Sequence, residues 1–207
     1  QKPNKDSDWI EIMSKTSLKG DSSNKFKIQS KSKINYIKLQ IFPDGGVARL
    51  RLFGEVKLNW ENYHNKNDLI ELSSLKLGGS IVAYNNAHYG DVSALLSHGR
   101  GKTMGDGWET RRRREPGNDW IIIKLATKGL IKKIEIDTAH FKGNYPDQAS
   151  VQVSNFDKNK GLEEVINDSH NWKYILDKSK LQADNIHNYE VNDTSIKGVT
   201  HVRLNIY

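Results

Sequence analysis

The sequence predicts an all-β protein, a β-sandwich of the jelly-roll or galactose-binding-like kind. Several short runs alternate apolar and polar residues with a period of two, which is the signature of half-buried strands. Turn-forming sequences separate these runs, and helical patterns are weak and short. Many short strands joined by turns are typical of antiparallel sandwiches, whereas a doubly wound α/β sheet would need a helix of normal length between its strands.

The elements can be placed in order along the chain. The run WIIIKLA is continuously apolar and predicts a strand buried on both faces, while the other runs alternate. Strands are expected at 36–42, 49–52, 120–126, 132–138, 149–154 and 201–207. Turns are expected at PDGG, LGGS, EPGN, TKG and KGNYPD. Short helical patterns occur at 68–75, 91–96 and 172–181.

The chain repeats itself. Trp9, Leu18 and Asp21 have the same spacing as Trp172, Leu181 and Asp184, and YIKLQIF (36–42) corresponds to HVRLNIY (201–207). The repeat unit is about 165 residues, the size of an ordinary domain. We therefore expect two domains. Residues 1–57 would be the C-terminal part of a first repeat, and 58–207 a second repeat that lacks the closing strand corresponding to 43–54.

Composition and charge argue against some classes of partner. Hydrophobic residues make up 36% and charged residues 28% of the chain, which is typical of a folded soluble protein. The net charge is +7, but the lysines are scattered and often accompanied by asparagine. Nucleic-acid binding requires basic residues clustered on one element, so we expect no nucleic-acid partner.

Membrane and redox chemistry are not indicated either. No window approaches the roughly 20 apolar residues of a membrane span. The first residues lack the apolar core of a signal peptide. The absence of cysteine excludes disulfides and thiolate chemistry. We expect a cytoplasmic protein with no membrane partner.

Residues 104–120, MGDGWETRRRREPGNDW, contain four consecutive arginines. The run could be a nucleic-acid patch, a solvated loop, or the wall of a pocket for an acidic small molecule. Acidic residues on both sides disfavour nucleic acid. If the segment is a strand, Arg111 and Arg113 lie on the face of Glu109 and the other two arginines on the opposite face. We expect Arg111 and Arg113 to face the ligand.

The stretch from Gly105 to Val153, GDGWETRRRREPGNDWIIIKLATKGLIKKIEIDTAHFKGNYPDQASVQV, resembles the allantoicase family. The family pattern is a Gly-Asp-Gly-Trp-Glu-Thr box followed by basic residues, an Asp-Trp strand, and an Asp-Thr, His-Phe and Gly-Asn-Pro series. These stand at 105–110, 119–120 and 137–146. PDGGVARLRLFG (43–54) and THVRLNIY (200–207) extend the resemblance over nearly the whole chain, since the family also has two similar jelly-roll repeats per subunit.

The resemblance implies hydrolysis of allantoate to ureidoglycolate and urea in purine catabolism through allantoin, with allantoate as the small-molecule partner. Allantoate carries one carboxylate and two ureido groups. A guanidinium binds a carboxylate in bidentate fashion, and a protein carboxylate can activate water or protonate departing urea. The candidate catalytic residues are Asp106, Glu109, Asp137 and His140, and the candidate substrate-binding residues are Arg111, Arg113, Trp108, Lys142 and Asn144.

Several of these candidates have a structural interpretation as well. Trp108 could belong to the core or floor a pocket. Asp106 could cap a turn, and Asn144 could bond its own backbone. Asp137 could be a hydrogen-bonded structural aspartate, and His140 a surface histidine.

The sequence requires no cofactor and predicts no metal ligand, because its seven histidines show no His-x-His or His-Glu-x-x-His spacing. A divalent metal stays open, since members of the family have been discussed as metal-dependent. We expect a homo-oligomer, because exposed strand edges can pair between subunits.

The chain departs from the family pattern at two places. Asn118 stands where the family has histidine, and Asn85-Asn86 where it has Ser-Asp. Asparagine has no accessible pKa and cannot replace a titrating group. The alternative function is therefore a catalytically weakened or non-catalytic small-molecule-binding sandwich of the same fold.

Overall fold

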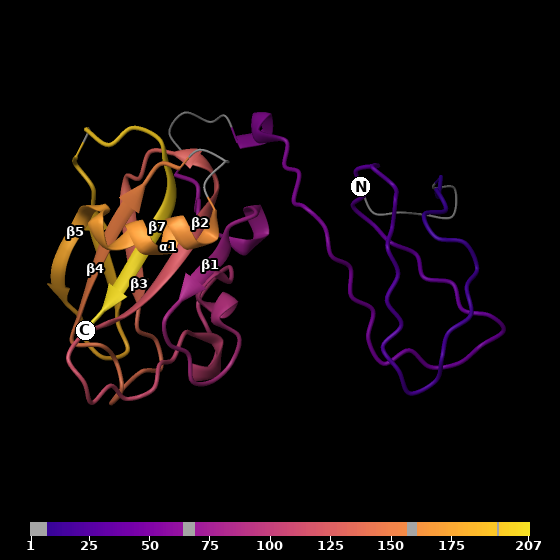
Figure 1. The fold of residues 1–207 in the computed structure, drawn as a ribbon, viewed down its shortest axis with the longest axis horizontal. Coiled ribbons are helices and arrows are strands. Elements are labelled where there is room, and N and C mark those ends of the chain that lie inside the picture. The colour runs from indigo at the N-terminus through magenta and orange to yellow at the C-terminus, as the bar shows by residue number, and fades with distance from the viewer. Residues whose placement is uncertain (1–7, 64–68, 157–160, 194) are drawn as a thin grey trace. The chain divides into compact units, whose positions relative to one another are not determined.

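The computed structural model describes residues 8–63, 69–156, 161–193 and 195–207. The chain splits into two compact units, Gln1–Lys57 and Leu58–Tyr207. The two units differ in kind: the first is drawn in Figure 1 as a plain tube, and the second contains all the described helices and strands.

The first unit contradicts two of the expected strands. Its described residues, 8–57, form no helix or strand, so neither 36–42 nor 49–52 is a strand. The apolar side chains that alternate there are exposed: Ile37 is 38%, Leu39 47% and Ile41 42% accessible. An alternating pattern supplies a face to bury, but a strand also needs a hydrogen-bonded neighbour for its backbone. No such pairing is present within the described part of this unit.

The second unit is the β-sandwich that the sequence predicts. A five-stranded antiparallel sheet has the order β1-β2-β7-β4-β5, and a two-stranded sheet pairs β3 with β6. The strands are β1 (Ser80–Tyr84), β2 (Asp119–Gly129), β3 (Lys133–Asp137), β4 (Gln148–Ser154), β5 (Lys173–Lys180), β6 (Ile186–Glu190) and β7 (Val199–Ile206). The strands expected at 120–126, 132–138, 149–154 and 201–207 are thereby confirmed as β2, β3, β4 and β7.

Strand β2 is buried on both faces, as its continuous apolar run predicts. It lies between β1 and β7, and Ile121 and Ile122 are fully inaccessible although they point to opposite faces. Burial on both faces requires a covering layer on each, and one of these is the helix α1 (Leu162–Asp168), which crosses the sheet in Figure 1. The helix contributes Val165 to a core cluster that also contains Ile122, Phe156 and Trp172.

The sheet face of Ile122 also carries a buried polar row. Arg203 lies opposite Ile122 on β7, and Asn205, Gln152 and Ser150 are almost inaccessible. The Arg203 guanidinium donates to Asn205 Oδ1 at 2.9 Å and to Ser169 Oγ at 2.6 Å. Burial lowers the pKa of Arg203. On β7 the polar residues Arg203 and Asn205 are thus buried. The apolar residues that alternate with them, Val202, Leu204 and Ile206, are only half-buried.

The helical predictions are only partly met. The segment 172–181 is not a helix but contains β5, because β4 offers it a pairing partner in which Val151 faces Leu176. The segment 91–96 contains a short 3-10 helix, η3, and among the described residues of 68–75 only Leu75 is helical, as the first residue of η2. The 3-10 helices are η1 (Trp60–Tyr63), η2 (Leu75–Leu77), η3 (Val92–Leu96), η4 (Met104–Asp106) and η5 (Ser169–Asn171). None of the helices in the described ranges is long and apolar enough to cross a membrane.

Candidate functional site

Two loops that carry most of the predicted site residues lie at the same end of the five-stranded sheet. The first leads into β2 and the second into β4. The first residue of β2, Asp119, pairs with Ile206, and Ala149 near the start of β4 pairs with the same residue from the other side. Because both strands are antiparallel to β7, their preceding loops meet at its C-terminal end.

Three contacts join these loops along their length. His140 Nε2 lies 2.9 Å from the Gly101 carbonyl oxygen, and Asn144 Nδ2 donates to Glu109 Oε1 at 3.0 Å. Between them the Phe141 ring packs on Gly107, where an added Cβ would lie 3.0 Å from the ring. A side chain at position 107 would displace the aromatic ring, so glycine permits this close approach. The loops 101–109 and 139–144 therefore form one surface, which we call the paired-loop site.

Glu109 is held at this surface by its backbone. It forms an isolated antiparallel bridge with Tyr89, and its carbonyl accepts from His88 N at 2.8 Å. Trp108 beside it is 8% exposed, and its indole N–H donates to the Asn86 carbonyl at 2.9 Å. Trp108 is therefore a buried support for Glu109, as its structural interpretation predicts, and its contact with substrate stays a prediction.

Asp106 caps η4. Its Oδ2 accepts from Lys102 N at 2.9 Å and from Thr103 N at 3.0 Å, and Thr103 completes a capping box. These hydrogen bonds, first of all that from Lys102, lower the pKa of Asp106. The capping alternative is therefore observed, and the catalytic role stays a prediction.

Asp137 and His140 belong to a charged cluster next to the paired loops. Asp137 accepts from Ala139 N at 2.8 Å and is paired with Arg100, whose Nε lies 3.3 Å from Asp137 Oδ2. Arg100 Nη2 is also 4.0 Å from Asp184 Oδ1. Asp184 in turn accepts from the backbone N–H of His140 at 2.8 Å, which lowers the pKa of Asp184. The charge of Lys142 acts in the same direction on that pKa.

The arginine run is not a strand, so the prediction that its side chains alternate between two sheet faces is wrong. Residues 111–114 form an extended loop in which all four arginines are exposed. Arg113 donates to Asp119, whose side chain is 6% exposed, against 32% for Arg113. Arg111 is held by its backbone instead, since its N–H lies 3.4 Å from Asn86 Oδ1. Residues 111–114 are followed by a turn and pair with no neighbouring strand, so their backbone does not form part of a sheet.

The asparagines that depart from the family pattern surround the same aspartate. Asp119 accepts from Asn85 Nδ2 at 3.3 Å and from Asn86 Nδ2 at 3.2 Å. Asn118 Nδ2 donates to Asn205 Oδ1 at 3.2 Å, which links this corner to the buried polar row. All three amides thus have structural partners, and Asp119 is the shared acceptor of two of them and of Arg113.

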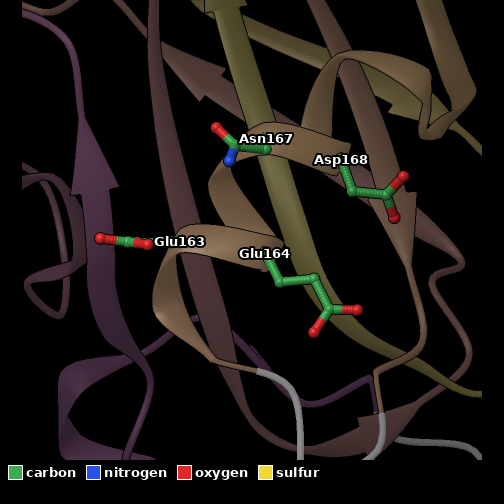
Figure 2. A pocket seen from close by; sticks show the side chains of 4 residues that line it. All are labelled: Glu163, Glu164, Asn167 and Asp168. Carbon is green, nitrogen blue, oxygen red and sulfur yellow. The ribbon is translucent and has the colours of Figure 1, made fainter.

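No metal centre is evident in the described ranges, where no group of three or more His, Cys, Asp or Glu side chains is placed to hold an ion. A shallow hollow over α1 is lined by Glu163, Glu164, Asn167 and Asp168, none of which is a predicted site residue. Figure 2 shows Glu163 and Asn167 pointing to one side of the helix and Glu164 and Asp168 to the other, so the four side chains do not converge on a ligand.

Sequence reasoning missed Arg100, Gly101 and Asp184. One signal for Asp184 was available, because Asp184 ends the repeated Trp–Leu–Asp pattern in which Asp21 holds the corresponding place. Both aspartates have left-handed backbones, with φ of 45° at Asp21 and 50° at Asp184. Arg100 and Gly101 carry no comparable sequence signal, since they enter the site only through the folding of the loop.

Comparisons with known proteins identify one family over nearly the whole chain. The model of the allantoicase repeat matches residues 1–57 and 70–207. A probable allantoicase of Burkholderia mallei is 44% identical over 204 residues, which cover 99% of this chain and 60% of that protein. A probable allantoicase of Rhizobium meliloti is 44% identical over 211 residues, with the same coverage of 99% and 60%.

A solved structure gives the same relationship. The crystal structure of allantoicase from Saccharomyces cerevisiae is 38% identical, with a TM-score of 0.56, over 66% of this chain and 39% of that one. The present chain spans about 60% of the length of the two bacterial relatives. A repeat model that covers nearly the whole chain and relatives at this identity lead to one conclusion: the chain belongs to the allantoicase family.

Proposed function

We propose that the protein hydrolyses allantoate to ureidoglycolate and urea, and that the paired-loop site binds the substrate. The observation that carries this proposal is the hydrogen-bonded pair of Glu109 and Asn144, held on a surface that also contains His140. The family to which the chain belongs supports the same reaction class.

The Glu109–Asn144 pair suits a ureido group. Asn144 donates to one carboxylate oxygen, Oε1, which leaves lone pairs on both oxygens of Glu109. A terminal ureido group presents two N–H donors side by side and a carbonyl acceptor. The carboxylate can accept the two N–H groups, while the Asn144 amide can donate to the ureido carbonyl in exchange for its weak contact with Met104 Sδ at 3.5 Å.

Cations are available for the substrate carboxylate. Arg111 and Lys142 are exposed and lie in the same two loop regions as Glu109 and Asn144. Arg113 is a poorer candidate, because its guanidinium is already paired with the buried carboxylate of Asp119. We therefore assign carboxylate binding to Arg111, in which a planar fork matches the two oxygens, with Lys142 as a second positive charge.

The reaction requires one C–O bond to form and one C–N bond to break at the carbon that carries the carboxylate. Water supplies the oxygen and loses a proton, and the departing urea nitrogen gains one. Among the titratable side chains of the paired-loop site, we assign the proton transfers to His140 and the binding of the ureido N–H groups to Glu109. The three asparagines that suggest a non-catalytic protein are hydrogen-bonded to Asp119 and Asn205. They make no hydrogen bond to Glu109 or His140 within the part of the chain that the structure describes.

Urea release from allantoate tests the proposal. The wild-type chain should release urea, and Glu109→Gln should lower kcat/KM by about tenfold to a hundredfold, the cost of losing charge-assisted hydrogen bonds to the ureido group. Glu115→Gln is the matched control, since Glu115 is exposed at the end of the same segment, and it should stay within about twofold of wild type. No urea from wild type, or equal activity of Glu109→Gln and wild type, would overturn the proposal.

A further inference from the structure

His140 has an unusual backbone for a residue with a side chain. Its φ is 70°, in the left-handed region that glycine, asparagine and aspartate occupy far more readily than histidine. Such conformations persist only where the surroundings hold them, and they cluster at functional sites. Neighbouring residues must therefore hold His140 in this conformation.

Asp184 holds it directly. Its Oδ1 accepts the His140 N–H at 2.8 Å, and its own N–H donates to the Phe141 carbonyl at 3.3 Å. Thr138 extends this pairing, because its hydroxyl donates to the Gln182 carbonyl at 2.6 Å and accepts from Asn185 N at 3.1 Å. The turn that contains His140 is thus fastened on both sides to the turn that contains Asp184.

The His140 ring is fixed by a different partner. Its Nε2 lies 2.9 Å from the carbonyl oxygen of Gly101. A carbonyl oxygen can only accept, so Nε2 carries the hydrogen and the neutral ring keeps its lone pair on Nδ1. Phe141 packed on Gly107 and Asn144 bonded to Glu109 place this ring on the surface proposed to bind substrate.

We infer that Asp184 is a positioning residue for His140 and that His140 acts through Nδ1. This inference rests on the proposed function. Nδ1 takes a proton from the attacking water as the C–O bond forms, and the imidazolium returns that proton to the urea nitrogen as the C–N bond breaks. The Nε2–H···O contact with Gly101 is kept in both charge states, so the ring does not turn between the two proton transfers. Asp184 acts through its hydrogen bond to the backbone of His140 and not by contact with the substrate.

Substitutions at Asp184 separate its acceptor oxygen from its charge. Asp184→Asn keeps an acceptor oxygen and a residue that tolerates the left-handed conformation, so its kcat should stay within about threefold of wild type. Asp184→Ala removes the acceptor oxygen and also the tolerance of the left-handed conformation. It should lower kcat by about tenfold or more, with KM changed less than about twofold. In a His140→Ala background, Asp184→Ala should lower kcat no further, because residues that act as a unit are not additive. Asp177→Ala, an exposed β5 carboxylate, is the matched control and should leave kcat unchanged.

Equal losses from Asp184→Ala in the two backgrounds, or no loss in either, would overturn the positioning role. A second measurement does not depend on turnover. Nitrogen-15 NMR of the wild-type chain, with the signal assigned by its loss in His140→Ala, should show the neutral ring protonated on Nε2. Protonation on Nδ1 would overturn the inference even if urea is released. Conversely, an inactive wild-type chain with the Nε2–H ring would count against the proposed function alone.

Discussion

Arg113 is paired with Asp119. This ion pair gives Arg113 a structural role, which distinguishes it from Arg111, although an alternating strand would place both on the same face. Asp119 is 5% exposed and also accepts hydrogen bonds from Asn85 and Asn86. A buried carboxylate that receives three donors anchors the loop at the point where β2 begins. The guanidinium that alternation would assign to substrate thus belongs to the framework.

Asp119→Asn should destabilise the protein. The amide presents hydrogens where the carboxylate received three donors, and it leaves Arg113 without its counter-charge. Because Arg113 is about one-third exposed, we expect a loss of about 2 kcal/mol rather than the 3–5 kcal/mol of a fully buried pair. Urea denaturation measures the change. Glu115→Gln is the control, and an equal free energy of unfolding for Asp119→Asn and this control would contradict the role of Asp119.

The arginines should respond differently to replacement by lysine. Arg111→Lys should lower kcat/KM for allantoate by about tenfold, since the charge is kept and the bidentate fork is lost. Arg112→Lys and Arg114→Lys are exposed controls and should each change it by less than about twofold. Steady-state assays of urea release test this. An equal loss at all three positions would indicate that the run acts as a diffuse positive field.

Asn144→Asp should give the proposed activity a new pH dependence. It places a second carboxylate where an amide now lies 3.0 Å from Glu109 Oε1. Two adjacent carboxylates cannot both ionise easily, so one pKa of the pair rises. The shared proton restores the hydrogen bond at low pH, and deprotonation breaks it as the pH rises. The loss of kcat/KM relative to wild type should therefore be largest at neutral pH and shrink towards about pH 5, and a pH-independent ratio would contradict the pairing.

The acid stability of the loops follows from two lowered pKa values. Hydrogen bonds from Lys102 and from His140 hold the pKa of Asp106 and of Asp184 below the ordinary value of 3.8. A carboxyl with a depressed pKa in the folded state stabilises the fold above its unfolded pKa, and this contribution is lost as the pH falls through the folded pKa. The backbone amides at 102, 103 and 140 should lose hydrogen-exchange protection below about pH 4. Undiminished protection at about pH 2 would show that neither carboxylate holds its loop.

The sequence predicts the central strands of the second unit well, because their patterns carry direct information about burial. The run 120–126 has too many consecutive apolar residues for a surface strand, and β2 is indeed buried on both faces. The segment 172–181 misleads because Trp172, Ile175 and Leu176 have helical spacing. Pairing with β4 decides its structure, and a single sequence does not contain that information. The helix α1 is only seven residues long, and its stability comes from packing Val165 on the sheet.

The sequence predicts which residues belong to the candidate site, but it does not predict which of them are in contact. The family motif brings Glu109, His140 and Asn144 to notice, and the fold places them on adjoining loops. Which arginine is paired, and which nitrogen of His140 is engaged, depends on Asp119 and on the Gly101 carbonyl. These partners come from turns whose closing geometry no local pattern specifies.

Mapping of allantoate on the chain by amide chemical shifts tests the location of the site directly. Allantoate should shift the amides of 101–109 and 139–144 in a saturable way, and Glu109→Gln should weaken these shifts while Glu115→Gln preserves them. Shifts confined to the acidic hollow at Glu163, Glu164, Asn167 and Asp168, or no saturable shift of the paired loops, would contradict the assignment of the site.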